Sequence, residues 1–123
     1  MVQIKTKLII ADNSGGKYAR CIRVYDKKYG NLCDFIVVTL LIFDITKKLV
    51  KKRKYIGLLI SVKRWKSRLN GIYLRYSRNR MILFQEHDKF GGTRIYGPLC
   101  RELRNKSLFS RFKKLLSYAK RII

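Results

Sequence analysis

The chain has 123 residues, 47% of them hydrophobic, and its 30 Lys and Arg outnumber seven Asp and Glu for a formal net charge of +23. This apolar content is enough for one folded domain with a core, and it excludes a disordered basic tail. A compact domain this basic repels itself unless a polyanion neutralises it. Nucleic acid is therefore the expected partner, with an anionic membrane surface as the weaker alternative.

Two further protein classes are excluded by short features of the sequence. The longest apolar run, Phe35 to Phe43, has about half the length of a membrane span, and the N-terminal residues show neither a signal-peptide core nor transit-peptide character.

The cysteines Cys21, Cys33 and Cys100 include no CxxC pair. Their odd number and wide spacing favour buried free thiols in a reducing compartment.

The first half of the chain predicts short β-strands. KLII (7–10) precedes the turn-rich ADNSGG, and RCIRVYD (20–26) alternates as a half-buried strand does. DFIVVTLLIFD (34–44) is apolar throughout, which fits a strand buried on both faces or one in a closed barrel. YIGLLISV (55–62) is the next strand. Since no helix separates these strands, we expect a small β-barrel rather than a parallel sheet.

Two hairpins are predicted in the middle of the chain. GIYLRYS (71–77) and RMILFQ (80–85) flank SRNR, which suits a turn between two strands. Asn70-Gly71 suits a two-residue hairpin turn, which makes KRWKSRLNG (63–71) part of an extended arm.

The C-terminal segment changes to a helical period. Pro98 suits the first turn of a short helix, PLCRELR (98–104). A second helix is predicted by an apolar stripe capped at Ser107 and made of Leu108, Phe109, Phe112, Leu115, Leu116 and Ala119. We therefore expect a mainly β single domain, 1–123, with a β-barrel over 1–97 and short α-helices over 98–123.

A catalytic or cofactor site is not expected. The only histidine, His87, lies in a polar turn, the carboxylates are scattered, and no phosphate-binding loop with its lysine occurs. Glu102 suits a local ion pair with its neighbours Arg101 and Arg104. ADNSGG reads as a tight turn closed by Asp and Asn, with amides beside Gly15 and Gly16 that suit a phosphate contact. The chain is predicted to be no enzyme and to hold no metal or cofactor.

RNA binding is predicted for the interval between Asp44 and Glu86, where every charged residue is Lys or Arg. A carboxylate there would repel a phosphate backbone. Within Lys63 to Arg80, basic residues alternate with Trp65, Tyr73 and Tyr76. Packing on the sheet is the expected role of Tyr73, whereas for Trp65 packing and stacking on a base stay equally open.

Several short motifs, in order, carry a resemblance to a known family. They are ADNSGG, CIRV, VKK at Val50, NGIYLRY, GGTRIYGP and RELR. The chain resembles the universal large-subunit ribosomal protein L-fourteen family in its bacterial and organellar form, from about Gln3 to Arg104 and more loosely in FKKLLSYA. This resemblance implies a five-stranded barrel with small C-terminal helices and no enzymatic activity.

The resemblance also implies partners. Family members bind large-subunit rRNA near the sarcin–ricin region and contact small-subunit rRNA in an intersubunit bridge. They lie beside large-subunit proteins three and nineteen and offer a surface to the ribosome silencing factor. The residues expected on that interface are Thr93, Arg94, Arg101 and Lys114. The residues expected to bind rRNA are Asn13, Ser14, Lys51, Lys52, Arg53, Lys54, Lys63, Arg64, Trp65, Lys66, Arg68, Arg75 and Arg78.

Some positions depart from the family pattern. Cys33 and Arg53 stand where glycines are usual, Leu69 begins the turn usually written PDG, and Ser77 replaces an aspartate. These changes weaken the expectation for the silencing factor more than that for rRNA. A composition rich in Lys, Ile, Tyr and Asn suggests an AT-rich code and a mitochondrial ribosome, with a plastid or bacterial cytoplasm as alternatives. The alternative function is a nonspecific nucleic-acid chaperone, which would share the charge without needing the GTRIYGP motif.

Overall fold

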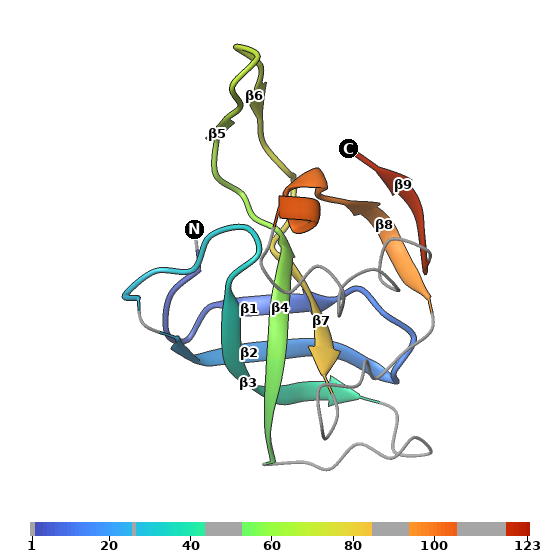
Figure 1. Ribbon diagram of the computed structural model, residues 1–123. Coiled ribbons are helices and arrows are strands. Elements are labelled where there is room, and N and C mark those ends of the chain that lie inside the picture. Colours follow the sequence, from blue (N-terminus) through green and yellow to red (C-terminus); the bar gives the residue numbers. More distant parts are fainter. Residues whose placement is uncertain (1, 26, 44–52, 85–93, 106–117) are drawn as a thin grey trace.

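A computed structural model describes residues 2–25, 27–43, 53–84, 94–105 and 118–123. Its elements are β1 (Lys7–Ile10), β2 (Gly16–Val24), β3 (Phe35–Phe43), β4 (Lys54–Ser61), β5 (Lys66–Ser67), β6 (Tyr73–Leu74), β7 (Arg80–Phe84), β8 (Ile95–Leu99), the 3-10 helix η2 (Arg101–Asn105) and β9 (Ala119–Ile122). Figure 1 shows a barrel from which the β5–β6 hairpin projects.

Five strands close the barrel in the order β1-β2-β3-β4-β7. Neighbouring strands pair antiparallel except β1 and β7, which pair parallel through Ile9↔Arg80 and Ile10↔Met81 and so complete the ring. Closure removes the free edges that an open sheet would present. The predicted five-stranded barrel is confirmed, and its sheet is mixed.

The buried residues form two cores on the two faces of β4 and β7. The barrel core includes Leu59, Met81 and Leu83, whereas the outer core includes their neighbours Leu58 and Ile82. Because successive side chains of a strand point to opposite faces, burial of consecutive residues means that both faces are covered. The outer core also contains Ile95, Leu99, Cys100 and Leu103, so β8 and η2 form the cover.

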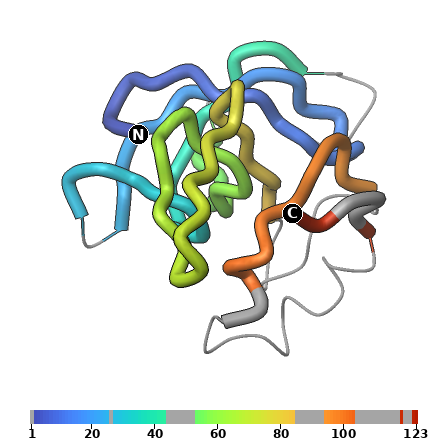
Figure 2. The backbone as a smooth tube through the Cα atoms, turned by 90° about the horizontal axis from the view of Figure 1, so that it is seen from above, coloured from blue at the N-terminus to red at the C-terminus, as the bar shows by residue number. Residues whose placement is uncertain are grey.

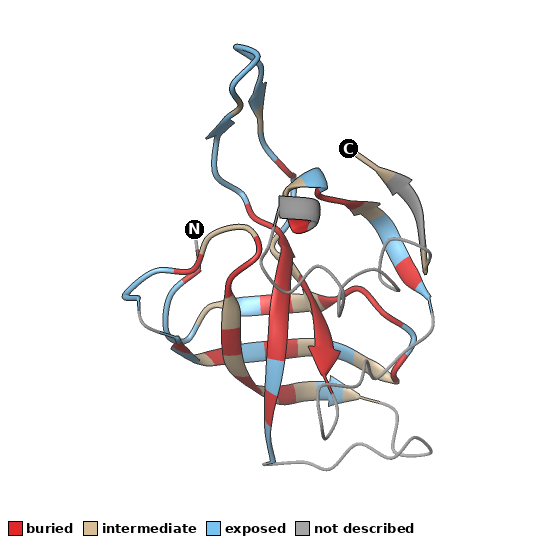
Figure 3. Cartoon of the chain, in the orientation of Figure 1, coloured by how far each residue is buried: buried red, intermediate tan, exposed pale blue. Residues whose placement is uncertain are grey.

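The apolar strand β3 lies in the closed barrel and is not buried on both faces. Ile36, Val38 and Leu40 are buried, and the alternate residues are only partly buried. Of the two predicted arrangements, the closed barrel is therefore correct. Burial on both faces occurs in β4 and β7 instead (Figure 3).

One predicted hairpin is confirmed and the other is wrong. β5 and β6 pair through Lys66↔Leu74 and Ser67↔Tyr73, so residues 63–79 form the arm. Strand β6 does not pair with β7, which lies between β4 and β1 in the barrel. The turn chemistry of Asn70-Gly71 decides the pairing, because Gly71 has the positive φ (82°) that a hairpin bulge requires.

The arm turn has three residues rather than the two that were predicted. Arg68 N donates to Ile72 O over 2.9 Å, and Gly71 N donates to Arg68 O over 3.1 Å. This is the pattern of a type I turn followed by a glycine in the left-handed region.

The C-terminal segment differs from the predicted helices. Pro98 lies inside β8 rather than at a helix start, and β8 pairs parallel with β9 through Pro98↔Arg121 and Leu99↔Ile122. RELRN forms a 3-10 helix, and Ala119, expected on a helical stripe, begins β9. At Ala119, pairing with β8 decides the structure rather than the predicted helical period. The rest of the predicted stripe, Leu108 to Leu116, lies outside the described residues.

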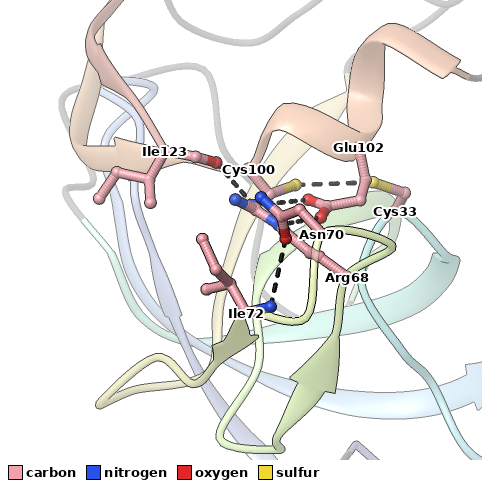
Figure 4. Close-up of polar contacts among 7 residues, drawn as sticks. All are labelled: Cys33, Arg68, Asn70, Ile72, Cys100, Glu102 and Ile123. Carbon is pink, nitrogen blue, oxygen red and sulfur yellow. Dashed lines mark hydrogen bonds and ion pairs between the residues drawn. The ribbon is translucent and has the colours of Figure 1, made fainter.

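The three cysteines are buried and free, as predicted. Cys33 and Cys100 are far apart in sequence, yet their sulfur atoms lie 3.5 Å apart (Figure 4). The contact with Cys33 and burial raise the pKa of the Cys100 thiol above its ordinary value.

In both views the arm stands between the two chain ends (Figures 1 and 2).

Candidate nucleic-acid interface

The arm carries the densest group of exposed cations in the described part of the chain. Its exposed basic residues are Lys63, Arg64, Lys66, Arg75 and Arg78. Two hydrogen bonds close the base of the arm and fasten it to the end of β4, because Lys63 N donates to Asn79 Oδ1 over 2.9 Å and Ser61 Oγ donates to Arg78 O over 2.8 Å. Five of the predicted rRNA-binding cations thus share one projecting, anchored element (Figure 3).

Trp65 stands free of the sheet, with 63% of its surface exposed. The Arg75 guanidinium carbon lies 5.9 Å from the centre of the indole ring, within cation–π range. Tyr73 is equally exposed, at 66%, so the expected packing of Tyr73 is wrong. Tyr76 belongs to the outer core, where burial raises the pKa of its phenol. Two of the three aromatic residues therefore face outward.

Arg68 is bound within the molecule. Its Nε and one terminal nitrogen donate to the two Glu102 oxygens over 2.8 and 3.3 Å, and that terminal nitrogen also donates to Ile123 O over 2.8 Å (Figure 4). The Glu102 hydrogen bonds raise the pKa of Arg68. Glu102 was expected to pair with Arg101 or Arg104; the ion pair described for it reaches Arg68, 34 residues earlier. This pair ties the arm to η2 and β9.

The three carboxylates that the structure describes are all bonded internally. Asp12 accepts from Ser14 and from Leu83 N, Asp34 accepts from Lys27 and Asn31 N, and Glu102 accepts from Arg68. Burial raises the pKa of Asp12, although its hydrogen bonds oppose the shift. No carboxylate in the described ranges is thus left unbonded beside the arm.

A second group of predicted cations lies at the other end of β4. Lys54 begins this strand and Ser61 ends it beside the arm, a separation of roughly 23 Å at about 3.3 Å per residue. Arg53 and Lys54 are exposed, and the Arg53 guanidinium carbon lies 5.7 Å from the Tyr55 ring centre. Among the described residues, the predicted cations therefore lie at the two opposite ends of β4, which Figure 1 shows well apart. Lys51 and Lys52 lie outside the described residues.

The ADNSGG turn and β8 are joined, although 80 residues separate them. Asn13 Oδ1 accepts from Arg94 N over 3.1 Å, and Tyr96 N donates to Ala11 O over 2.6 Å. Between these contacts, Asp12 and Ile95 form an antiparallel β-bridge. Within the turn, Ser14 N and Oγ both donate to Asp12, which confirms the predicted tight turn. Ser14 is accordingly buried, whereas Asn13 is exposed.

The predicted interface residues are described in part. The Arg94 side chain is exposed while its amide is held by Asn13. Arg101 is also exposed, and its amide donates to Ile123 O over 3.0 Å. Both cations therefore stand on fixed backbone. Thr93 and Lys114 lie outside the described residues, as does His87.

Gly97 makes room for Arg80. The guanidinium of Arg80 donates to Tyr96 O and Pro98 O, the carbonyls on either side of Gly97, and its Nε donates to Ser61 Oγ over 3.0 Å. Burial lowers the pKa of Arg80. Arg80 therefore holds β8 on the barrel and belongs to the fold rather than to the exposed charge.

Sequence reasoning missed a basic face on β1 and β2. Lys7 and Arg20 are exposed and directly opposed in register, and Arg23 is exposed further along β2. Like charges opposed across a strand pair destabilise the sheet. In KYARCIRV the basic residues recur at every third position, so strict alternation would not place Arg20 and Arg23 on one face; the register shift between Cys21 and Arg23 does so.

Other site types lack support in the described ranges. Among those residues, no three His, Cys, Asp or Glu gather as metal ligands. No helix described there is long and apolar enough to cross a bilayer.

Comparison with known proteins identifies relatives over the whole length. The family model described as "Ribosomal protein L14p/L23e" matches residues 1–123. The chain is 34% identical over 126 residues to "Large ribosomal subunit protein uL14" of Carsonella ruddii (strain PV), and the match covers 100% of both chains.

Proposed function

Because this chain belongs to the ribosomal protein L14p/L23e family, we propose that its arm anchors it on large-subunit rRNA while Arg94 contacts small-subunit rRNA in an intersubunit bridge. As a family member, it is a large-subunit ribosomal protein with a structural role in translation, and it is not an enzyme.

One observation carries the anchoring proposal: the cations are exposed and the described carboxylates are not free. Asp12, Asp34 and Glu102 are bonded inside the molecule, whereas the five arm cations face outward. Phosphates are therefore attracted without a competing repulsion. The proposed contacts also include Asn13, Trp65, Arg53 and Lys54, together with Lys51 and Lys52. Arg68 and Ser14 are proposed as supports that hold the binding elements in place.

The bridge proposal is supported by the fixing of Arg94. The Arg94 amide donates to Asn13, and the next residue, Ile95, forms a β-bridge with Asp12 of the ADNSGG turn. The Arg94 side chain is therefore attached to a fixed stretch of backbone. A cation on rigid backbone loses less conformational entropy when it binds. We assign Thr93, Arg101 and Lys114 to the same face, which is also the proposed site for the ribosome silencing factor.

The proposed neighbours follow from the family resemblance, and the proposed compartment follows from the composition. We propose large-subunit proteins three and nineteen as adjacent chains and the sarcin–ricin region as the rRNA site. The composition, rich in Lys, Ile, Tyr and Asn, favours a mitochondrial ribosome over a plastid or bacterial one. Sedimentation of the protein with large subunits from purified mitochondria tests this assignment.

Two variants separate anchoring from bridging. Arg64→Ala with Lys66→Ala should lower the affinity for a large-subunit rRNA fragment. It should also make the slope of log affinity against log salt concentration shallower, by about one for each removed cation that contacts a phosphate. Arg94→Ala should leave that affinity near normal and impair joining of reconstituted subunits. If Arg94→Ala joins subunits normally, the bridge proposal fails. If rRNA binding is insensitive to salt, the anchoring proposal fails.

The alternative, a nonspecific chaperone, predicts a different pattern. Such a protein would bind unrelated RNA of equal length as tightly as cognate rRNA. It would also show no defect in subunit joining for Arg94→Ala. The hydrogen bond that fixes Arg94 on Asn13 favours the specific function, because a nonspecific cation needs no fixed position.

A further inference from the structure

A pocket of about 250 Å³ lies where the arm leaves the barrel. Its apolar lining is Leu32, which packs against both cores, and Val62, which is buried in the barrel core. Trp65 also lines the pocket and is largely exposed. Side chains anchored in a core are held in place before any ligand arrives, so this part of the pocket is preformed.

The remaining lining is cationic and polar. Arg64 and Lys66 supply two positive charges, and Asn31 and Ser67 supply an amide and a hydroxyl. Arg64 is held in position because one terminal nitrogen donates to Asn31 Oδ1 over 3.2 Å. Arg75 adds a third charge beside the indole of Trp65. None of the lining residues that the structure describes is acidic.

We propose that this pocket receives one unstacked nucleotide of the rRNA. The base stacks on Trp65 above the apolar lining, and Lys66 and Arg64 bind its flanking phosphates. Aromatic rings beside cations are the usual platform for single-stranded bases. The inference rests on the proposed function, since it names the part of the rRNA that the arm takes.

The size and charge of the pocket favour this occupant. Pockets for drug-sized ligands run from roughly 300 to 1,000 Å³, so 250 Å³ suits a single base better than a longer segment. A base paired in an A-form duplex cannot enter, because its faces are stacked and its edges lie in the grooves. The occupant must therefore come from a loop, a bulge or a strand end. The cationic lining favours a nucleotide over a neutral or basic peptide.

Tetraribonucleotides of equal charge test the proposal on the full chain. One probe carries a single adenine among three abasic sites, and the other is fully abasic. Because Trp65 is the only tryptophan, its fluorescence reports directly on the pocket. The adenine probe should quench this fluorescence and bind roughly five- to a hundredfold more tightly than the abasic probe.

Variants show whether Trp65 is responsible. With end-labelled probes read by anisotropy, Trp65→Ala should remove the preference for adenine, and Trp65→Phe should restore part of it. Tyr73→Ala is the matched control, because Tyr73 is equally exposed on the same arm but does not line the pocket. It should keep the preference. Circular dichroism confirms that each variant is folded.

The failure of this inference is distinguishable from that of the proposed function. Equal affinity for both probes, an unchanged preference in Trp65→Ala, or an equal loss in Tyr73→Ala would overturn the nucleotide pocket. In each case salt-dependent binding of the wild-type chain to the rRNA fragment would leave the proposed function standing. Equal affinity for both probes is also the result expected if a protein segment fills the pocket. Absence of binding to the rRNA fragment would overturn both.

Discussion

Gly97 and Arg80 depend on one another. Gly97 has φ = +84°, a region that residues with a Cβ rarely occupy, and the position of that Cβ is already taken by the Arg80 guanidinium. The guanidinium in turn bonds to the carbonyls of Tyr96 and Pro98. The glycine of the GTRIYGP motif therefore serves the docking of β8 on the barrel.

Gly97→Ala should cost more stability than the same change at Gly71. Gly71 also has a positive φ, but nothing lies within 4 Å of the position that a Cβ would take. Gly71→Ala should therefore lower the free energy of unfolding by only about 1–2 kcal/mol, the cost of a left-handed backbone conformation. Gly97→Ala adds the displacement of Arg80, worth about 1–3 kcal/mol more. Urea unfolding of the two variants measures the difference. Equal losses would show that Arg80 moves aside freely.

At the scale of elements, the arm is fastened at its base and braced once more near its turn, by Arg68. Its two strands have two residues each, too few to hold a direction by themselves. Arg68 supplies the missing support by bonding to Glu102 on η2 and to Ile123 after β9 (Figure 4). The direction of the arm is thus set by segments 34 and 55 residues further along the chain.

Arg68→Ala should loosen the arm and leave the barrel intact. The change leaves the partly buried Glu102 without its ion-pair partner, and we expect a loss of about 1–3 kcal/mol. Hydrogen exchange at the Arg68-position and Gly71 amides should accelerate, while the amides of β3 and β4 stay protected. Arg78→Ala, which removes an exposed arm cation, should change stability by about 0.5 kcal/mol or less. If hydrogen exchange at the turn amides were unchanged in Arg68→Ala, Arg68 would not be what holds the arm in place.

At the scale of the whole molecule, the free protein is under electrostatic strain. The net charge is +23, and Lys7 and Arg20 stand directly opposed on β1 and β2. Such a surface suits a protein whose working partner is a polyanion. Away from that partner, dissolved salt is what screens the repulsion.

Added NaCl should therefore raise the melting temperature of the free protein. We expect a rise of several degrees between low and moderate ionic strength, measured by circular dichroism. Arg20→Glu replaces the like-charged pair by an opposite one and leaves the Lys7 ammonium over the Tyr18 ring, so it should stabilise the protein at low salt by about 0.2–1 kcal/mol. The same variant should gain less from added salt than the wild type. A melting temperature that falls as salt is added would contradict this account.

The strands of the barrel were predictable because their signal is local. Alternation in β2, the apolar run of β3 and the turn residues of the arm each act over a few residues, and the pattern of a buried strand or tight turn is written there. Much of the candidate site was equally visible: a carboxylate-free interval predicted the exposed cations of the arm and Trp65 among them. The basic face of β1 and β2 was not visible in this way, because it depends on the register shift between Cys21 and Arg23.

The sequence by itself thus determined a basic, five-stranded barrel of the ribosomal L14p/L23e type with a projecting arm. Only the tertiary structure decided which cations are free, because that depends on partners distant in the chain. Arg68 and Arg80 look like their neighbours in sequence, yet Glu102 and the carbonyls beside Gly97 bind them inside the fold. Pairing of β9 with β8 likewise decided the structure at Ala119, which the local pattern had placed on a helix. Such long-range contacts leave no mark in the local pattern, since their energy exists only once the segments have met.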